Sequence, residues 1–218
     1  DCDSGAWVEI YNGQSVAASL AGWSLTDDPA VPRKWALPSI SLPPYAYTVV
    51  WADGKNRSVA PNYHANFALQ KAGGHLALIK PDGVTAASRY AYGWQAADVS
   101  FGVLRPTLDQ GYFETPRPGL KNTGVQASGP PSLEEVAFSR SGGLLSGPAA
   151  LTVAAPVEAG AVVRYTVDNT RPHAGSPVWP AAGITLNDPA TPGALNASVN
   201  IRAAVFAPGR LPGKISSR

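Results

Sequence analysis

The sequence predicts an all-β protein of two tandem β-sandwich domains, on three observations. The 218 residues include 22 Gly and 21 Pro, well above the average share, and the longest stretch free of both runs only from Ala194 to Ala207. Since Pro in a helix interior removes a hydrogen bond and clashes with the preceding turn, helical bundles and coiled coils are excluded. Hydrophobic residues make up 44%, enough for packed cores. Short apolar runs recur between turn residues, a spacing typical of sandwich strands.

In the first half, each expected strand ends at turn residues. Strands are expected at residues 7–11, 20–25, 47–52, 75–80 and 84–88. The last two form a predicted hairpin around Pro81, Asp82 and Gly83, because Pro presets φ near the turn value and Gly supplies a positive φ.

The stretch 123–132 mixes Gly, Pro and Ser, and its only bulky apolar residue is Val125, so it is expected to be a linker. It divides the chain into domains at 1–122 and 133–218. In the second domain, strands are expected at residues 151–153, 162–167, 183–186 and 199–206. No repeat relates the two halves.

The first half resembles the lamin-tail domain, an immunoglobulin-like sandwich. The motifs that carry the resemblance are Trp7-Val8-Glu9-Ile10-Tyr11-Asn12, Leu20-Ala21-Gly22-Trp23-Ser24-Leu25-Thr26-Asp27-Asp28, Lys34-Trp35-Ala36-Leu37-Pro38, residues 42–52, His64-Ala65-Asn66-Phe67-Ala68-Leu69 and Tyr112-Phe113-Glu114-Thr115-Pro116-Arg117-Pro118-Gly119. They extend over residues 7–119 in the order of that family. The resemblance implies an immunoglobulin-like fold.

The second half resembles the small sandwich module appended to chitobiases and β-hexosaminidases at their C-terminus. Its markers are Phe138-Ser139, Ser146-Gly147-Pro148, residues 160–168, Pro172 and residues 201–209. The chain has Asp168-Asn169-Thr170 where the family usually has Asp-Gly-Ser, and Asn tolerates the left-handed conformation of Gly. In bacteria such a pair is similar to accessory segments of long exported proteins. This implies an extracellular or cell-envelope location and flanking domains in the same polypeptide.

Charge and hydropathy exclude two classes of partner. Charged residues are only 15%, the formal net charge is +2, and the basic residues are scattered singly, whereas a nucleic-acid binder concentrates Lys and Arg on one face. No apolar run approaches the ~20 residues that cross a bilayer, so membrane insertion is not expected. The single Cys2 forms no disulfide within the chain.

No motif of catalysis is found, so the chain is not expected to be an enzyme. Gly-x-Gly does not occur, and the nearest approach to a nucleophile elbow, residues 13–17, follows a strand with no helix after it. Of the three histidines, His64 is expected to make a structural hydrogen bond. Aspartates could supply calcium ligands, yet each also stabilises its turn by accepting nearby N–H bonds, and no cofactor or metal is predicted. These aspartates are Asp27, Asp28, Asp53, Asp82 and Asp168.

The aromatic residues divide into core and surface candidates. Trp23, Trp35 and Trp51 are expected to fill the first sandwich, with Tyr47 beside them. The candidate ligand contacts are Tyr92, Trp94 and Trp179, because rings on loops can stack on sugars or partner proteins.

The predicted function is that of a non-catalytic interaction or spacer segment of a larger exported bacterial protein. The alternative is a carbohydrate-binding accessory module of a secreted enzyme. The expected partner is a protein or an extracellular glycan.

Overall fold

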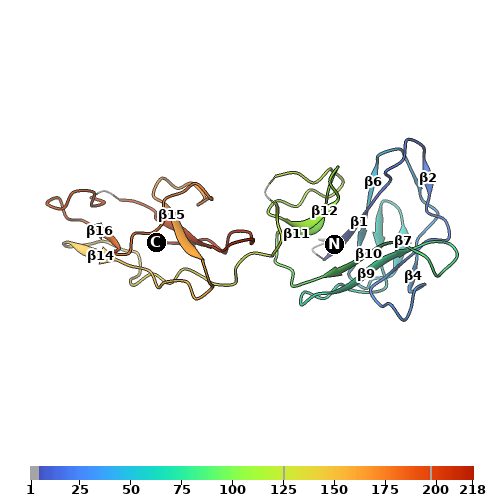
Figure 1. Ribbon diagram of the computed structural model, residues 1–218, viewed down its shortest axis with the longest axis horizontal. Helices are drawn as coiled ribbons and strands as arrows, with labels where there is room; N and C mark the ends of the chain where they lie inside the picture. The colour runs from blue at the N-terminus through green and yellow to red at the C-terminus, as the bar shows by residue number, and fades with distance from the viewer. Residues whose placement is uncertain (1–4, 125, 197) are drawn as a thin grey trace. The chain divides into compact units, whose positions relative to one another are not determined.

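Strands, turns and loops make up the described chain. The structure, a computed structural model, describes residues 5–124, 126–196 and 198–218, and no helix occurs within these ranges (Figure 1). Accordingly, none of the described segments forms a helix long and apolar enough to span a membrane. The chain divides into an N-terminal unit, residues 1–110 and 115–124, and a C-terminal unit, residues 111–114 and 125–218. The predicted all-β class is confirmed.

The first sheet of the N-terminal unit has the strand order β1-β6-β8-β7. Strand β1 (Trp7–Tyr11) runs antiparallel to β6 (Tyr47–Trp51), which runs parallel to β8 (Asn62–His64). Strand β7 (Arg57–Val59) closes the far edge against β8. Strands β1 and β7 are therefore the two edges of this sheet.

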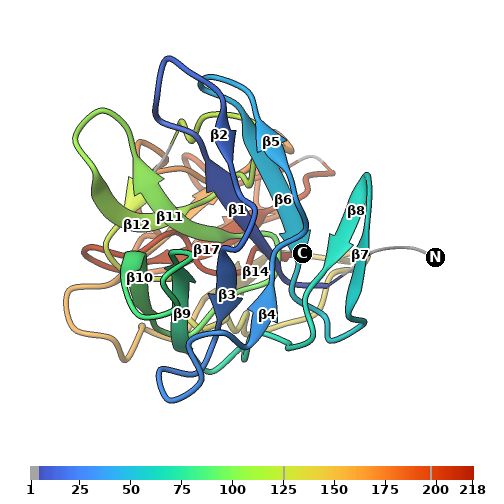
Figure 2. The same cartoon turned by 90° about the vertical axis from the view of Figure 1, so that its right-hand side faces the viewer.

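The second sheet has the order β10-β9-β3-β4. Strand β9 (Gly74–Ile79) pairs antiparallel with β10 (Ala86–Tyr92) and with β3 (Ser24–Thr26), and β3 pairs with β4 (Trp35–Ala36). Figure 2 shows β1 and β6 above β3, β9 and β10. Two sheets packed in this way form the immunoglobulin-like sandwich that the sequence predicts.

The predicted hairpin of residues 75–88 is confirmed as β9 and β10. Lys80 N–H donates to Thr85 C=O at 2.8 Å, and Gly83 N–H donates to Lys80 C=O at 2.9 Å. Gly83 has φ +76°, the left-handed conformation that the turn requires.

Two shorter pairs complete the N-terminal unit. Strand β2 (Ala18–Ser19) pairs antiparallel with β5 (Ser41–Leu42). Strand β11 (Ser100–Leu104) turns into β12 (Asp109–Phe113), whose first residues belong to this unit. Strand β11 lies beside β1 (Figure 2).

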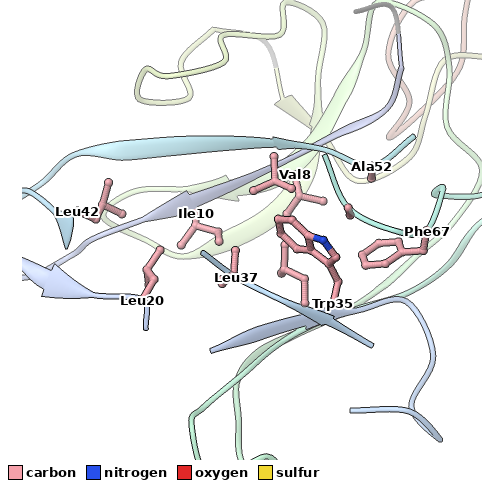
Figure 3. Close-up of a cluster of buried hydrophobic side chains, with 11 residues drawn as sticks. Val8, Ile10, Leu20, Trp35, Leu37, Leu42, Ala52 and Phe67 are labelled. Atoms are coloured by element: carbon pink, nitrogen blue, oxygen red, sulfur yellow. The ribbon is translucent and has the colours of Figure 1, made fainter. Parts of the chain in front are cut away.

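The core of the N-terminal unit lies between the two sheets (Figure 3). Successive side chains of a strand point to opposite faces, so every second residue of a strand faces the core. The buried cluster consists of Val8, Ile10, Leu20, Leu25, Trp35, Leu37, Leu42, Val50, Ala52, Ala65 and Phe67. Trp35, 3% exposed, is its largest member, as expected from the sequence.

The expectation that Trp51 fills this core is wrong. Val50 and Ala52 on either side of it are buried in the core, so alternation turns the indole of Trp51 to the outer face of β6. There it stands opposite Trp7 in the β1–β6 register.

The C-terminal unit has two small sheets. Strand β14 (Ala149–Leu151) pairs with β16 (Ile184–Leu186), and β17 (Arg202–Phe206) lies between β15 (Val162–Thr166) and β18 (Ser216–Ser217). These strands and the loops between them bury Val136, Leu151, Val163, Trp179, Ile184, Ile201, Ala203 and Val205.

Much of the expected linker at 123–132 is part of the C-terminal unit. Strand β13 (Gln126–Ala127) pairs with Tyr112 and Phe113 at the end of β12. Gly129 N–H donates to Gly209 C=O at 2.8 Å, and the Ser132 hydroxyl bonds to a carboxylate oxygen of Glu158 at 3.0 Å. Main-chain pairing therefore orders a segment whose composition alone indicated flexibility. Val125, also expected there, lies outside the described residues.

Candidate functional site

The N-terminal unit has a cavity of about 1100 Å³ beside β1, which we term the edge cavity. Its walls are β1 with its flanking residues (5–14) and the segment 95–103, which includes residues 100–103 of β11. Its floor is formed by Leu76 and Leu78 of β9 and by Ser88, Tyr90 and Tyr92 of β10.

The pattern of lining residues gives the orientation of each strand toward the cavity. Strand β10 contributes alternate residues at 88, 90 and 92, together with Ala87 where its pairing with β9 is irregular, so it presents mainly one face. In contrast, every residue from 5 to 14 and from 95 to 103 borders the cavity. Because side chains alternate between faces, an unbroken run means that β1 and β11 meet the cavity edge-on.

The edge cavity is open because the sandwich is incomplete on this side. Strand β1 ends the first sheet and β10 ends the second. Leu76 and Leu78 pack against the core cluster, yet both are only partly buried. An extra strand beside β1 would cover them.

Eight aromatic residues of the described chain contribute to the lining. They are Trp7, Tyr11, Trp23, Tyr47, Trp51, Tyr90, Tyr92 and Phe101. The rings of Tyr11 and Tyr47 lie 4.6 Å apart, and Tyr90 meets Phe101 edge-on at 6.5 Å. The Arg105 guanidinium stacks 4.2 Å above the Tyr11 ring. Such rings combine a broad apolar surface with a polar tip, so they suit ligands of mixed polarity.

Charged groups of both signs border these rings: Glu9, Lys71, Asp98, Arg105 and Lys121. Gly119 N–H donates to Glu9 Oε1 at 2.6 Å, while burial raises the pKa of the Glu9 carboxyl and this hydrogen bond partly offsets the rise. Burial also raises the pKa of Tyr90, an effect that the positive charge of Arg105 opposes. The tyrosine therefore carries a neutral hydroxyl at physiological pH.

The three predicted ligand contacts occupy different environments. Tyr92 lines the edge cavity. Trp94 follows β10 and is partly buried, with Lys71 Nζ 5.5 Å from its ring centre, and it is not a lining residue.

The expectation that Trp179 lies exposed on a loop is wrong. Its side chain is only 9% exposed and belongs to the core of the C-terminal unit. It meets Phe138 and Tyr165 edge-to-face, with ring centres 5.7 and 5.1 Å away. Surrounding Pro and Ala suggested a surface loop, but backbone bonding to Val163 C=O draws Trp179 onto the sheet.

Sequence reasoning missed most of the cavity rings. The signal available was the alternation in residues 7–11, where Val8 and Ile10 face the core and Trp7, Glu9 and Tyr11 take the opposite face. Two aromatic residues on the non-core face of an edge strand mark a surface that needs covering.

Asp28, Asp53, Asp82 and Asp168 serve their turns, as the sequence predicts, whereas the Asp27 carboxylate forms an ion pair with Lys34 Nζ at 2.6 Å. The Asp82 carboxylate accepts N–H bonds from Val84 and Thr85, both at 2.9 Å. A hydrogen bond from the Thr85 side chain and these two N–H bonds lower the pKa of Asp82 to about 2. Asp28 accepts from Ala30, and Asp168 accepts from Thr170. Within the described ranges, no group of three or more His, Cys, Asp or Glu side chains is placed to hold a metal ion.

His64 forms the predicted structural hydrogen bond. Its side chain is fully buried, with Nδ1 3.0 and 3.1 Å from the two carboxylate oxygens of Asp53. Burial by itself would raise the pKa of Asp53, but hydrogen bonds from His64 and Lys55 outweigh it, so the pKa lies below its ordinary value. The pair ties β8 to the turn after β6 and does not border the edge cavity.

The C-terminal unit has a smaller hollow of about 420 Å³, lined mainly by apolar and Pro residues with Asp168 at its margin. The Asp168 carboxylate already accepts bonds from the main-chain N–H and hydroxyl of Thr170. The hollow therefore offers few polar groups that could orient a ligand.

Comparison with known proteins finds a family match in each unit. The lamin tail domain family matches residues 1–93, and a family described as Fn3 associated matches residues 154–218. The first match agrees with the lamin-tail resemblance, whereas the second does not confirm the chitobiase-type assignment. No curated protein and no solved structure matches the chain.

The matched families agree with the observed architecture. The lamin tail domain is immunoglobulin-like, and both families are typically non-catalytic, with no enzyme family matched. These matches suggest a non-catalytic accessory module.

Proposed function

We propose that the chain is a non-catalytic interaction segment of a larger exported bacterial protein, and that its N-terminal unit binds an extended ligand in the edge cavity. The observation that carries this proposal is the edge cavity itself, with its two strand edges and its aromatic lining. Both matched families support the non-catalytic part.

The size and chemistry of the edge cavity favour an elongated ligand of mixed polarity. Its volume of about 1100 Å³ exceeds the roughly 300–1000 Å³ typical of pockets for compact small molecules. The rings offer apolar contact along the walls, while Glu9, Lys71, Asp98, Arg105 and Lys121 offer hydrogen bonds at the margins. Such a ligand would be held by contact area and by a few directed bonds.

A protein and an extracellular glycan are the two partner classes under this proposal. The carbohydrate alternative is favoured by Tyr90 and Tyr92, whose rings lie on the floor of the cavity. Trp94 does not line the cavity and stays a predicted contact. An exported, extracellular or envelope location and flanking domains are part of the same proposal, because both partner classes occur there.

The proposal is tested by filling the edge cavity. Ser88→Trp adds an indole on the cavity floor without removing a core side chain, because Ser88 lines the cavity and is only partly buried. The matched control is Ser58→Trp, the same substitution at an exposed position of β7.

Chitin, cellulose and peptidoglycan oligosaccharides and a phage library of random nonapeptides are offered to the chain, and chemical-shift changes locate any binding. We expect at least one probe to perturb edge-cavity residues, with binding lost in Ser88→Trp and kept in Ser58→Trp. Failure of every probe to bind there would overturn the proposed function.

A further inference from the structure

The backbone of β1 bonds to a neighbour on one side only. Ala52 N–H donates to Ala6 C=O at 2.7 Å, and Asn12 N–H donates to Ala46 C=O at 3.0 Å. In an antiparallel pair, the residues that bond across the ladder alternate with those whose N–H and C=O point away. The even-numbered residues between 6 and 12 therefore bond to β6.

It follows that the N–H and C=O groups of Trp7, Glu9 and Tyr11 point away from β6. Strand β1 is the last strand of its sheet, and within the described chain no backbone group pairs with these three residues. They point into the edge cavity, which borders every residue of β1. Three donors and three acceptors thus stand in a row, spaced two residues apart.

The floor beneath this row is apolar. Leu76 and Leu78 of β9 face the first sheet but remain partly buried, and Tyr90 continues the same face on β10. A strand added beside β1 would place alternate side chains over these residues. The partly covered side chains of the floor and the unpaired N–H and C=O groups of β1 thus lie in the same place.

We propose that the occupant of the edge cavity is an extended polypeptide segment of a partner protein, apolar at alternate residues, that adds a strand to β1. This inference rests on the proposed function of the edge cavity. Donors and acceptors that repeat every roughly 7 Å match the backbone of another strand. Sugar hydroxyls have no such repeat, so the free edge favours a peptide over a glycan.

Charge adds a preference to the partner segment. Lys71, Arg105 and Lys121 border the edge cavity against Glu9 and Asp98, so its margin has a small excess of positive charge. Glu9 is already engaged by Gly119 N–H. Acidic residues flanking the apolar positions of the partner segment would complement this margin.

The experiment begins with a phage library of random nonapeptides selected on the intact chain. We expect enrichment of sequences with apolar residues at alternate positions and without interior Pro. A synthetic peptide from this selection should slow hydrogen exchange of the amides of Trp7, Glu9 and Tyr11 at least tenfold.

Variants of the strand edge isolate the backbone contribution. Glu9→Pro removes an N–H that β6 does not use, and an edge strand tolerates Pro at such a position. Glu9→Ala removes the same side chain but keeps the N–H. We expect Glu9→Pro to bind the selected peptide at least tenfold more weakly than Glu9→Ala.

The matched control is Ser58→Pro at the other edge of the same sheet. The two-residue turn Ala60-Pro61 joins β7 to β8, so Val59 and Asn62 form the hydrogen-bonded pair that closes the hairpin, and Ser58 N–H points outward from β7, away from the edge cavity. This variant should bind the selected peptide as the unchanged chain does. If Glu9→Pro fails to fold, hydrogen exchange on the unchanged chain still decides the question.

The possible outcomes separate the two proposals. Selected peptides that leave the β1 amides unprotected would overturn strand addition. Oligosaccharides that bind in the edge cavity while no peptide is enriched would also overturn it, but would leave the proposed function standing. If neither class of probe binds there, both proposals fail.

Discussion

Replacement of Trp179 by Ala tests the packing of the C-terminal unit most directly. The indole is almost fully buried between Phe138 and Tyr165. Truncation of a buried Trp costs about 3–5 kcal/mol through lost transfer energy and the cavity left behind. Each edge-to-face pair is worth about 0.5–1.5 kcal/mol, so a value of about 4 kcal/mol is expected.

The assay is hydrogen exchange of the amides in β17, the central strand of its sheet. A loss of about 4 kcal/mol should speed exchange of its slowest amides roughly a thousandfold, since 1.4 kcal/mol corresponds to a factor of ten. Trp179→Phe should cost about 1–3 kcal/mol, because it keeps a ring and removes no hydrogen bond: within the described chain, Nε1 has no partner. Exchange accelerated less than fivefold in Trp179→Ala would refute the buried position.

Three further perturbations test the rest of the structure. Trp35→Ala should lower the free energy of unfolding of the N-terminal unit by about 3–5 kcal/mol, whereas Trp51→Ala on the outer face should lower it clearly less. Equal losses of this free energy in urea titrations would contradict the assignment of the two rings to opposite faces. The pKa of Asp53 is lowered in the folded state, so the stability that its carboxylate contributes is present above its ordinary pKa and lost as pH falls through the folded value. Asp53→Asn should therefore be less stable than the unchanged chain at pH 6. A stability difference that persisted undiminished at pH 2 would contradict an origin in the charged carboxylate. Gly193→Ala should lower the stability of the C-terminal unit by about 1–2 kcal/mol because of the left-handed backbone alone. Gly183→Ala should lower it more, because the added Cβ would lie 2.7 Å from the carbonyl oxygen of Leu151. Thermal melts that give the reverse order of stability would refute this contact.

The sequence by itself determined the all-β class, the hairpin of residues 75–88 and the turn roles of Asp28, Asp82 and Asp168. These features depend on local chemistry: Pro and Gly restrict the backbone, and Asp accepts N–H bonds two or three residues ahead. The core position of Trp35 also followed from the lamin-tail pattern. The structural hydrogen bond of His64 was predicted, but its partner Asp53 was not, because the two are brought together only when β8 lies beside β6.

Only the tertiary structure decided which rings are covered. Trp51 and Trp179 exchanged their expected environments, because the buried fraction of a ring depends on which segment packs over it, and that segment is remote in sequence. The same reason explains the expected linker, whose order comes from backbone pairing with residues near Gly209. The alternation in residues 7–11 indicated an uncovered face, but the edge cavity itself did not follow from the sequence. It results from how two sheets end: β1 is the last strand of one, β10 is the last strand of the other, and the side chains between them lack a covering strand.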